Sequence, residues 1–134
     1  MVRYTAVDDV GVLINHTLAE GQIHGAVMQG AGQVFGEQCV YDPATGQLLT
    51  GSFMDYVAPH ADLIGSFTIV EVSVPSPNNA LGVKGVGEAG TIGSLPACIN
   101  AVLDALRRAG VTHFDMPATP GRLWEAIKNA RASR

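Results

Sequence analysis

The hydrophobic positions of this chain follow two different periods, and each period predicts a different kind of element. From residue 92 to 106 apolar side chains recur at the spacing of a helix face, at Ile92, Leu95, Ile99, Val102, Leu103 and Leu106. The pattern predicts a helix over this stretch. Pro96 is expected in its first turn, where a missing N–H is tolerated, and Gly110 is expected as its C′ cap.

A second helical pattern extends over residues 18–38 and contains an unusual number of glycines. Each glycine costs roughly 0.5–1 kcal/mol relative to alanine inside a helix. We therefore expect another part of the protein to pack very close to this helix. The five positions are Gly21, Gly25, Gly30, Gly32 and Gly36.

Shorter apolar segments predict strands. Residues 3–10 and 68–74 each have the pattern of one strand, and apolar side chains on both sides of the second indicate that both of its faces are covered. Residues 37–41 and 47–50 flank an Asp-Pro…Gly turn, which predicts a hairpin.

A third helix is predicted near the C-terminus. Thr119 can cap it and Pro120 can occupy its first position, followed by the apolar stretch 123–127. Together the elements predict an α+β fold, in which a small mixed sheet is packed by two or three helices.

The composition changes this picture in one respect. The 134 residues are 47% apolar and only 15% charged, which is unusually apolar for a small domain with much surface to cover. We expect much of that surface to meet other protein. The predicted first strand starts without a lead-in, which indicates a piece of a longer chain or one part of a divided subunit.

The charge pattern argues against several partners. The formal charge is −4 and the only basic run is Arg107-Arg108, which argues against nucleic acid. No apolar stretch is expected to approach the roughly 20 residues that a membrane span needs, and the N-terminal residues lack the basic-then-apolar pattern of a signal peptide. Cys39 and Cys98 stand alone, which favours the cytoplasm. The histidines lack metal-ligand spacing, so no metal is placed on protein side chains; they are His16, His24, His60 and His113.

The densest signal is the segment Gly82–Gly93, with five glycines in twelve residues. Its only charged residues are Lys84 and Glu88. Glycine allows a positive φ or a close approach of backbone to a ligand, and the segment leads into the predicted helix at residue 92. Because a helix N-terminus binds anions, the segment predicts a loop that contacts a ligand.

One interpretation of this loop is dinucleotide binding. Residues 85–90 satisfy G-x-G-x-x-G, and a short strand at 111–115 could end in a ribose-binding acid, Asp115. That fingerprint requires an apolar strand directly before the first glycine. The segment 75–80 stands in that place and contains two prolines, which a central strand does not accommodate.

The other interpretation is a family resemblance. The run Lys84–Glu88 followed by a helix resembles the last molybdenum-cofactor segment of the xanthine dehydrogenase and aldehyde oxidase family, with the large subunit of the carbon monoxide dehydrogenase type most similar. The resemblance extends from about Tyr4 to Ile127, in five patches. The other patches are the acidic turn at Asp8–Gly11, the segment Val27–Gln33, the aromatic segment Gly51–Tyr56 and Pro117–Pro120.

The resemblance implies roles for particular residues. Glu88 matches the family glutamate that acts as general base, Gln29 matches a glutamine that contacts the pterin, and Phe53 and Tyr56 would line the substrate channel. The remaining cofactor-binding positions it implies are Gly30, Lys84, Gly85, Val86 and Gly87. A simpler role is open for each group: Glu88 could cap its own helix, and the aromatic rings could pack in a core.

Two expectations concern the charged residues near the loop. Lys84 and the helix N-terminus could oppose the rise in the pKa of Glu88 that burial would cause. Asp8 and Asp9 are expected to serve turn formation rather than to act as a catalytic pair.

The resemblance also implies what surrounds this chain. Residues 1–134 would be the C-terminal part of a molybdopterin-binding domain, holding a molybdenum-molybdopterin cofactor in its cytosine dinucleotide form. The rest of the large subunit, an iron–sulfur subunit and an FAD subunit would complete a hydroxylase of aldehydes, N-heterocycles or similar small molecules, while the chain alone would be inactive. The copper-binding cysteine loop of carbon monoxide chemistry is not matched by Cys39 or Cys98. A non-catalytic assembly fragment is a third possibility.

Overall fold

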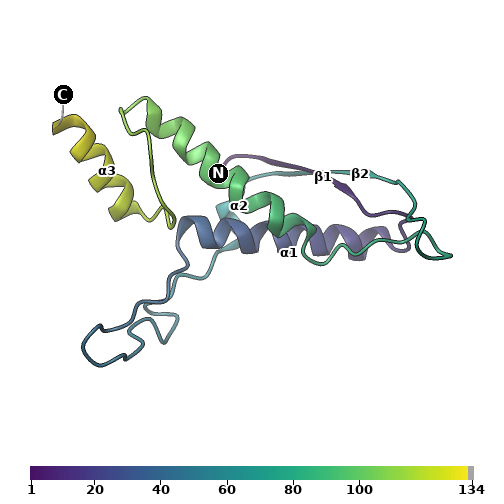
Figure 1. Ribbon diagram of the computed structural model, residues 1–134, viewed down its shortest axis with the longest axis horizontal. Helices are drawn as coiled ribbons and strands as arrows, with labels where there is room; N and C mark the ends of the chain where they lie inside the picture. The colour runs from purple at the N-terminus through teal and green to yellow at the C-terminus, as the bar shows by residue number, and fades with distance from the viewer. Residues whose placement is uncertain (133–134) are drawn as a thin grey trace. The chain divides into compact units, whose positions relative to one another are not determined.

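The computed structural model describes residues 1–132 and has three long helices and two strands (Figure 1). The elements in chain order are β1 (Tyr4–Asp9), α1 (His16–Phe35), the 3-10 turn η1 (Ala61–Leu63), β2 (Phe67–Val72), α2 (Ala89–Arg107) and α3 (Pro120–Ala132). This arrangement confirms the predicted α+β class. Two compact units share the chain, one formed by residues 1–30 with 60–94 and the other by residues 31–59 with the chain from 95 onward.

The first unit contains a two-stranded parallel sheet. β1 pairs with β2 in a register that sets Tyr4 opposite Phe67 and Asp9 opposite Val72. One face lies towards α1, where the ring of His24 lies 4.6 Å from the ring of Phe67. The other face is open among the described residues: Val70 and Val72 of β2 are 45% and 41% exposed. The expectation that both faces of the second strand are covered is therefore wrong for this part of the chain.

Helix α1 begins after an asparagine cap. The Asn15 side chain accepts a hydrogen bond from the Leu18 N–H at 3.0 Å, which satisfies one of the free donors of the first turn. In the first unit Ile23 and Val27 are completely buried. The helix ends at Phe35, three residues before the predicted end, where the N–H groups of Gly36 and Glu37 both bond to the Gly32 carbonyl.

Four glycines of the predicted helix, three within α1 and Gly36 directly after it, fall into two groups. A β-carbon on Gly32 would lie 2.8 Å from the Pro59 ring, and one on Gly36 would lie 2.7 Å from Val57. Close packing, as expected, explains these two. A β-carbon on Gly21 or Gly25 would meet nothing within 4 Å, so no described residue explains them.

Helix α2 begins earlier than the sequence pattern indicates. It starts at Ala89, so the second half of the glycine segment is helical and Pro96 lies inside the helix. The expectation that Pro96 occupies the first turn is wrong, because Gly90 and Gly93 continue the helix towards the N-terminus without adding apolar side chains to its pattern. At the other end Gly110 has a φ of 89°, and its N–H bonds to the Arg107 carbonyl. The predicted C′ cap is confirmed.

Helix α2 is also long and apolar enough to cross a membrane, with 19 residues and a mean hydropathy of 1.3. The expectation that no apolar stretch approaches the length of a membrane span is therefore wrong, as judged by length and composition alone. A single helix of this kind is weak evidence for a span, because the core helix of a soluble protein meets the same criteria.

The remaining predictions concern short elements of the second unit. The expected hairpin is reduced to a single antiparallel bridge between Tyr41 and Leu48, around a turn in which Gly46 has a φ of 73°. Residues 111–115 contain no strand. Thr119 and Pro120 cap and start α3 as predicted, with the Arg122 N–H 3.5 Å from the Thr119 hydroxyl.

Candidate functional site

The segment Gly82–Glu88, called the glycine loop below, is held at its start by backbone bonding. The Val12 N–H donates to the Gly82 carbonyl at 2.9 Å, and the Lys84 N–H donates to the Val10 carbonyl at 3.2 Å. The amide of Asn79 also bonds to both backbone groups of Val83. The first three residues of the loop are therefore fixed against the turn that follows β1.

Asp9 adds an ion pair to this anchor. Lys84 Nζ lies 2.5 Å from Asp9 Oδ2, and Asp9 Oδ1 accepts hydrogen bonds from the N–H groups of Gly11 and Val74. The lysine contact and the two backbone donors lower the pKa of Asp9 to about 2. Asp9 therefore supports the turn as expected, and the ammonium of Lys84 faces Asp9 rather than Glu88.

The middle of the glycine loop has open space beside its backbone. A β-carbon on Gly85 or Gly87 would meet nothing within 4 Å, and both residues are exposed, as is Glu88. Neither glycine has a positive φ, so backbone conformation does not explain them. Open space beside the backbone is what close approach of a ligand requires.

The far end of the loop is held by contact with α1. A β-carbon on Gly90 would lie 2.9 Å from the Ile23 carbonyl oxygen and 3.0 Å from the Ala26 β-carbon. One residue further, the Thr91 hydroxyl donates to the Ala26 carbonyl at 2.9 Å. The N-terminus of α2 is therefore seated directly on α1.

Thr91 also connects the two predicted cofactor patches. Its hydroxyl lies 3.3 Å from Gln29 Oε1, while its backbone N–H bonds to the carbonyl of Glu88 at 3.1 Å. Gln29 is exposed and Gly30 beside it is buried. The structure thus brings Gln29 next to the end of the loop that carries Glu88, although the two residues are 59 positions apart in the sequence.

Glu88 itself stands immediately before α2. Its backbone carbonyl accepts hydrogen bonds from Thr91 and Ile92. Its carboxylate has neither a hydrogen bond nor an ion pair with any residue from 1 to 132. It is an exposed acid at the positive end of a helix, and a side-chain cap on its own helix is not formed.

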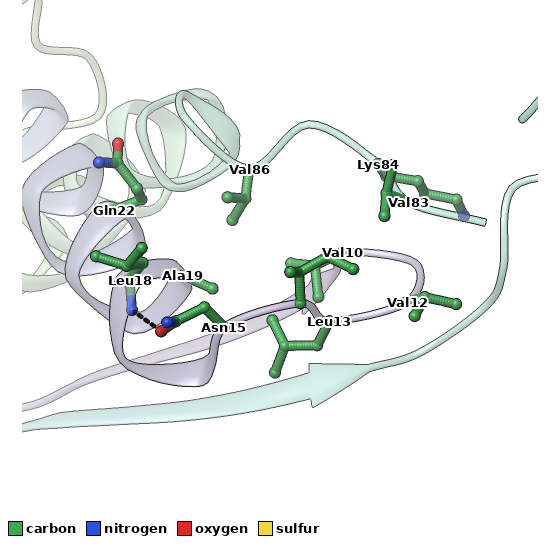
Figure 2. Close-up of a pocket in the computed structure, with 11 residues that line it drawn as sticks. Val10, Val12, Leu13, Asn15, Leu18, Ala19, Gln22, Val83, Lys84 and Val86 are labelled. Carbon is green, nitrogen blue, oxygen red and sulfur yellow. Dashed lines mark hydrogen bonds between the residues drawn. The ribbon is translucent and has the colours of Figure 1, made fainter. Parts of the chain in front are cut away.

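A hollow of about 260 Å³ lies under the start of the loop. Figure 2 shows side chains from the β1–α1 connection, from α1 and from the glycine loop around it. The loop contributes Val83, Lys84 and Val86, and the half-buried side chain of Val86 lines this mostly apolar hollow. The other lining residues include Val10, Leu13 and Leu18.

The two predicted channel residues belong to the second unit. Phe53 is 85% exposed, and Tyr56 is half-buried. With Thr50, Gly51 and Ser52 they line a hollow of about 220 Å³. The pKa of Tyr56 is raised, mainly because the side chain is partly desolvated and secondly because the negative charge of Glu37 is nearby. Among the described residues the ring of Phe53 is exposed, so the alternative role, packing in a core, does not apply to it in this part of the protein.

Sequence reasoning missed the anchoring residues. No role was predicted for Asn79 or Thr91, and Asp9 was predicted only to stabilise a turn. One signal was available in the sequence. Lys84 is the single cationic residue of the glycine loop and is expected to pair with an acidic side chain, and the acidic turn at Asp8 and Asp9 offers one in the first unit. Across residues 1–132, no group of three His, Cys, Asp or Glu side chains could hold a metal ion.

The fold also bears on dinucleotide binding. Strand β2 ends at Val72, well before Gly85, and turn residues occupy the intervening segment. The glycine loop therefore lacks the strand that a dinucleotide fingerprint requires directly before it.

Comparison with known sequences identifies the family. Residues 1–65 match the model of the molybdopterin cofactor-binding domain. The large subunit of nicotine 6-hydroxylase from Paenarthrobacter nicotinovorans is 46% identical over 123 residues, which cover 92% of this chain and 15% of that protein. The large chain of carbon monoxide dehydrogenase from Hydrogenophaga pseudoflava is 41% identical over 126 residues, or 94% of this chain and 16% of the relative.

Solved structures agree. The chain matches the crystal structure of Cu,Mo-CO dehydrogenase in its carbon monoxide reduced state with a TM-score of 0.89 and 35% identity, over 96% of this chain and 16% of that one. Quinoline 2-oxidoreductase from Pseudomonas putida 86 matches with a TM-score of 0.88 and 38% identity, over 95% of this chain and 16% of that one. The chain thus spans about one sixth of the length of these relatives.

Proposed function

Because the chain belongs to the molybdopterin cofactor-binding family of xanthine dehydrogenase and carbon monoxide dehydrogenase large subunits, we propose that it supplies the cofactor loop and the general base Glu88 to a molybdenum hydroxylase. The observation that carries this proposal is the link through Thr91. That residue connects Gln29 to the end of the loop bearing Glu88, so the two patches of family resemblance meet at one place.

The geometry of the loop fits a bound cofactor. Gly85 and Gly87 leave the space beside the backbone open, and Gln29 offers an amide that can both donate to and accept from the edge of a pterin. We assign cofactor contact to Gln29, Gly30 and the segment Lys84–Gly87. Since the Lys84 ammonium is engaged with Asp9 and its N–H with the Val10 carbonyl, its contact would come from the backbone carbonyl.

Glu88 would act as the base. When bound, the molybdenum cofactor supplies the two-electron oxidising centre of such an enzyme. Glu88 is the only carboxylate in the glycine loop, and no described residue competes for it. A general base must come within about 2.6–3.2 Å of the proton it accepts, and an unpaired carboxylate is free to do so through either of its oxygens.

The names of relatives support the wider assembly. One is the large subunit of nicotine 6-hydroxylase and another is subunit gamma of the 6-hydroxypseudooxynicotine dehydrogenase complex. We propose that this chain works with the rest of a large subunit, an iron–sulfur subunit and an FAD subunit, and that its cofactor has the cytosine dinucleotide form. Nicotine and quinoline, named in two relatives, contain nitrogen heterocycles, so an N-heterocycle is the proposed substrate class; aldehydes remain the alternative.

Metal analysis of the native complex tests the proposal. Molybdenum in near-equal amount to this chain, together with larger partner proteins, is expected. Glu88→Gln should then abolish turnover while molybdenum stays bound, because the amide keeps the shape of the acid but cannot accept the proton. Glu125→Gln, an exposed substitution on α3, is the matched control and should keep full activity. Absence of molybdenum and partners would favour a non-catalytic assembly fragment.

A further inference from the structure

The carboxylate of Asp9 joins three segments of the first unit. Its Oδ1 accepts the Gly11 N–H at 3.0 Å and the Val74 N–H at 3.2 Å, while its Oδ2 accepts the Lys84 ammonium at 2.5 Å. Gly11 belongs to the turn after β1, Val74 to the chain after β2, and Lys84 to the glycine loop. Two oriented backbone donors fix the carboxylate, and the carboxylate in turn fixes the lysine.

The glycine loop needs such a fixed point. Between Lys84 and Ala89 the backbone of the described chain has few hydrogen bonds. The Ala89 N–H donates to the Val86 carbonyl at a long 3.4 Å, and the Glu88 carbonyl accepts from the N–H groups of Thr91 and Ile92 at the start of α2. A β-carbon on Gly85 or Gly87 would meet nothing within 4 Å, so no described residue packs against the backbone on that side. The path of the segment carrying Glu88 is therefore set by its two ends, which are the contact of Gly90 with α1 and the anchor at Lys84.

We propose that Asp9 is a positioning residue for Glu88, acting through its ion pair with Lys84, and that the Lys84 side chain tethers the loop. The inference rests on the proposed function of Glu88. The two side chains are about one third exposed, at 36% and 33%, and exposed ion pairs contribute little to stability. The effect is therefore expected on the geometry of the base more than on folding.

Substitutions in the complete enzyme test the tether. Asp9→Asn keeps an oxygen for the two backbone donors but places an amide against Lys84, and Lys84→Met removes the ammonium. Because a misplacement of about 1 Å can cost roughly 100-fold in rate, each variant should lower kcat by about 10- to 100-fold. KM and the molybdenum content per subunit should not change. The double variant should be no slower than either single one, and Lys84→Arg should restore most of kcat.

The control is Asp42→Asn, in a turn of the second unit. The Asp42 carboxylate also accepts a backbone N–H and a side-chain donor, at 2.8 Å from Ala44 and 3.0 Å from Thr45, but it has no link to the loop. This variant should keep the kcat of the wild type.

Three results would overturn the tether. They are an unchanged kcat in Asp9→Asn, losses that multiply in the double variant, and loss of molybdenum in Lys84→Met alone, which would make Lys84 a direct cofactor ligand. Glu88→Gln separates this failure from failure of the proposed function. If Glu88→Gln is inactive while Asp9→Asn keeps the kcat of the wild type, only the tether is wrong. If Glu88→Gln stays active, the role of Glu88 is wrong.

Discussion

Gly90 and Ile23 approach so closely that the first of them has no room for a side chain. A β-carbon on Gly90 would lie 2.9 Å from the backbone carbonyl oxygen of Ile23, which is fixed within α1. Thr91 then donates its hydroxyl to the Ala26 carbonyl, one helical turn further along α1. The start of α2, and with it the end of the glycine loop, depends on this contact between two backbones.

Gly90→Ala is therefore expected to destabilise the protein. The added methyl group meets backbone, which cannot rotate away, so we expect a loss of about 1–3 kcal/mol in the free energy of unfolding. Chemical denaturation of wild type and variant measures the difference. An unchanged midpoint and slope would show that α2 can move away from α1 at no cost.

Gly25→Ala is the matched control in α1. A β-carbon there meets nothing within 4 Å, and alanine is the better helix former by roughly 0.5–1 kcal/mol. We expect stabilisation of that order in this chain. Destabilisation of the complete large subunit by the same substitution would show that another part of that subunit covers this side of α1.

Gly110→Ala tests the end of α2. Gly110 has a φ of 89°, where an L residue is strained, and it lies in the stretch where the N–H groups of Gly110 and Val111 close the helix. We expect a loss of about 1–2 kcal/mol in the free energy of unfolding. Gly121→Ala on α3, where a β-carbon would meet nothing within 4 Å, should not be destabilising.

The features that the sequence predicted correctly depend on local chemistry. Gly110 at the end of α2 and Thr119 with Pro120 at the start of α3 follow from capping preferences, which act within a few residues. The α+β class follows from the two hydrophobic periods. The resemblance of the glycine loop to one family also came from a short contiguous motif, and the comparisons confirmed that family.

The features that the sequence did not predict depend on contacts between distant segments. Pro96 is a good first-turn residue by local rules, yet α2 starts at Ala89 because Gly90 and Thr91 dock onto α1. Lys84 has Glu88 four positions away, yet its partner is Asp9, 75 positions distant. Neither the start of α2 nor the partner of Lys84 can be predicted from spacing along the chain, because each depends on where β1 and α1 place their residues in space.

The Asp9–Lys84 pair predicts a dependence of stability on pH. The pKa of Asp9 is lowered from 3.8 to about 2 in the folded state. A carboxyl group with a depressed folded pKa contributes stability that is fully present above its unfolded pKa and is lost as the pH falls through the folded one. The contribution should therefore disappear between about pH 4 and pH 2.

Thermal unfolding of wild type and Asp9→Asn across that range checks this dependence. The wild type should have the higher Tm at pH 6, and the difference should shrink as the pH approaches 2. Asp55→Asn, at a carboxylate that accepts a hydrogen bond from the Ser52 hydroxyl at 3.3 Å and has no ion pair among the described residues, serves as the comparison. A constant difference between wild type and Asp9→Asn would mean that the asparagine acts through shape rather than charge.

Phe53 offers a way to separate a functional role from a structural one. Its ring is 85% exposed and Met54 beside it is 93% exposed, so Phe53→Ala should change the free energy of unfolding by no more than about 0.5 kcal/mol. If the ring lines the substrate channel of the complete enzyme, the same variant should raise KM, because an aromatic contact with the substrate is lost.

Phe67→Ala provides the contrast. That ring lies 6.2 Å from the ring of Tyr4 and 4.6 Å from the ring of His24, between the sheet and α1, and its half-buried side chain should contribute about 1–2 kcal/mol to stability. Its loss should lower Tm and leave KM unchanged in enzyme that remains folded. If Phe53→Ala instead lowers Tm as Phe67→Ala does and leaves KM unchanged, Phe53 packs against another part of the large subunit, and the channel role is wrong.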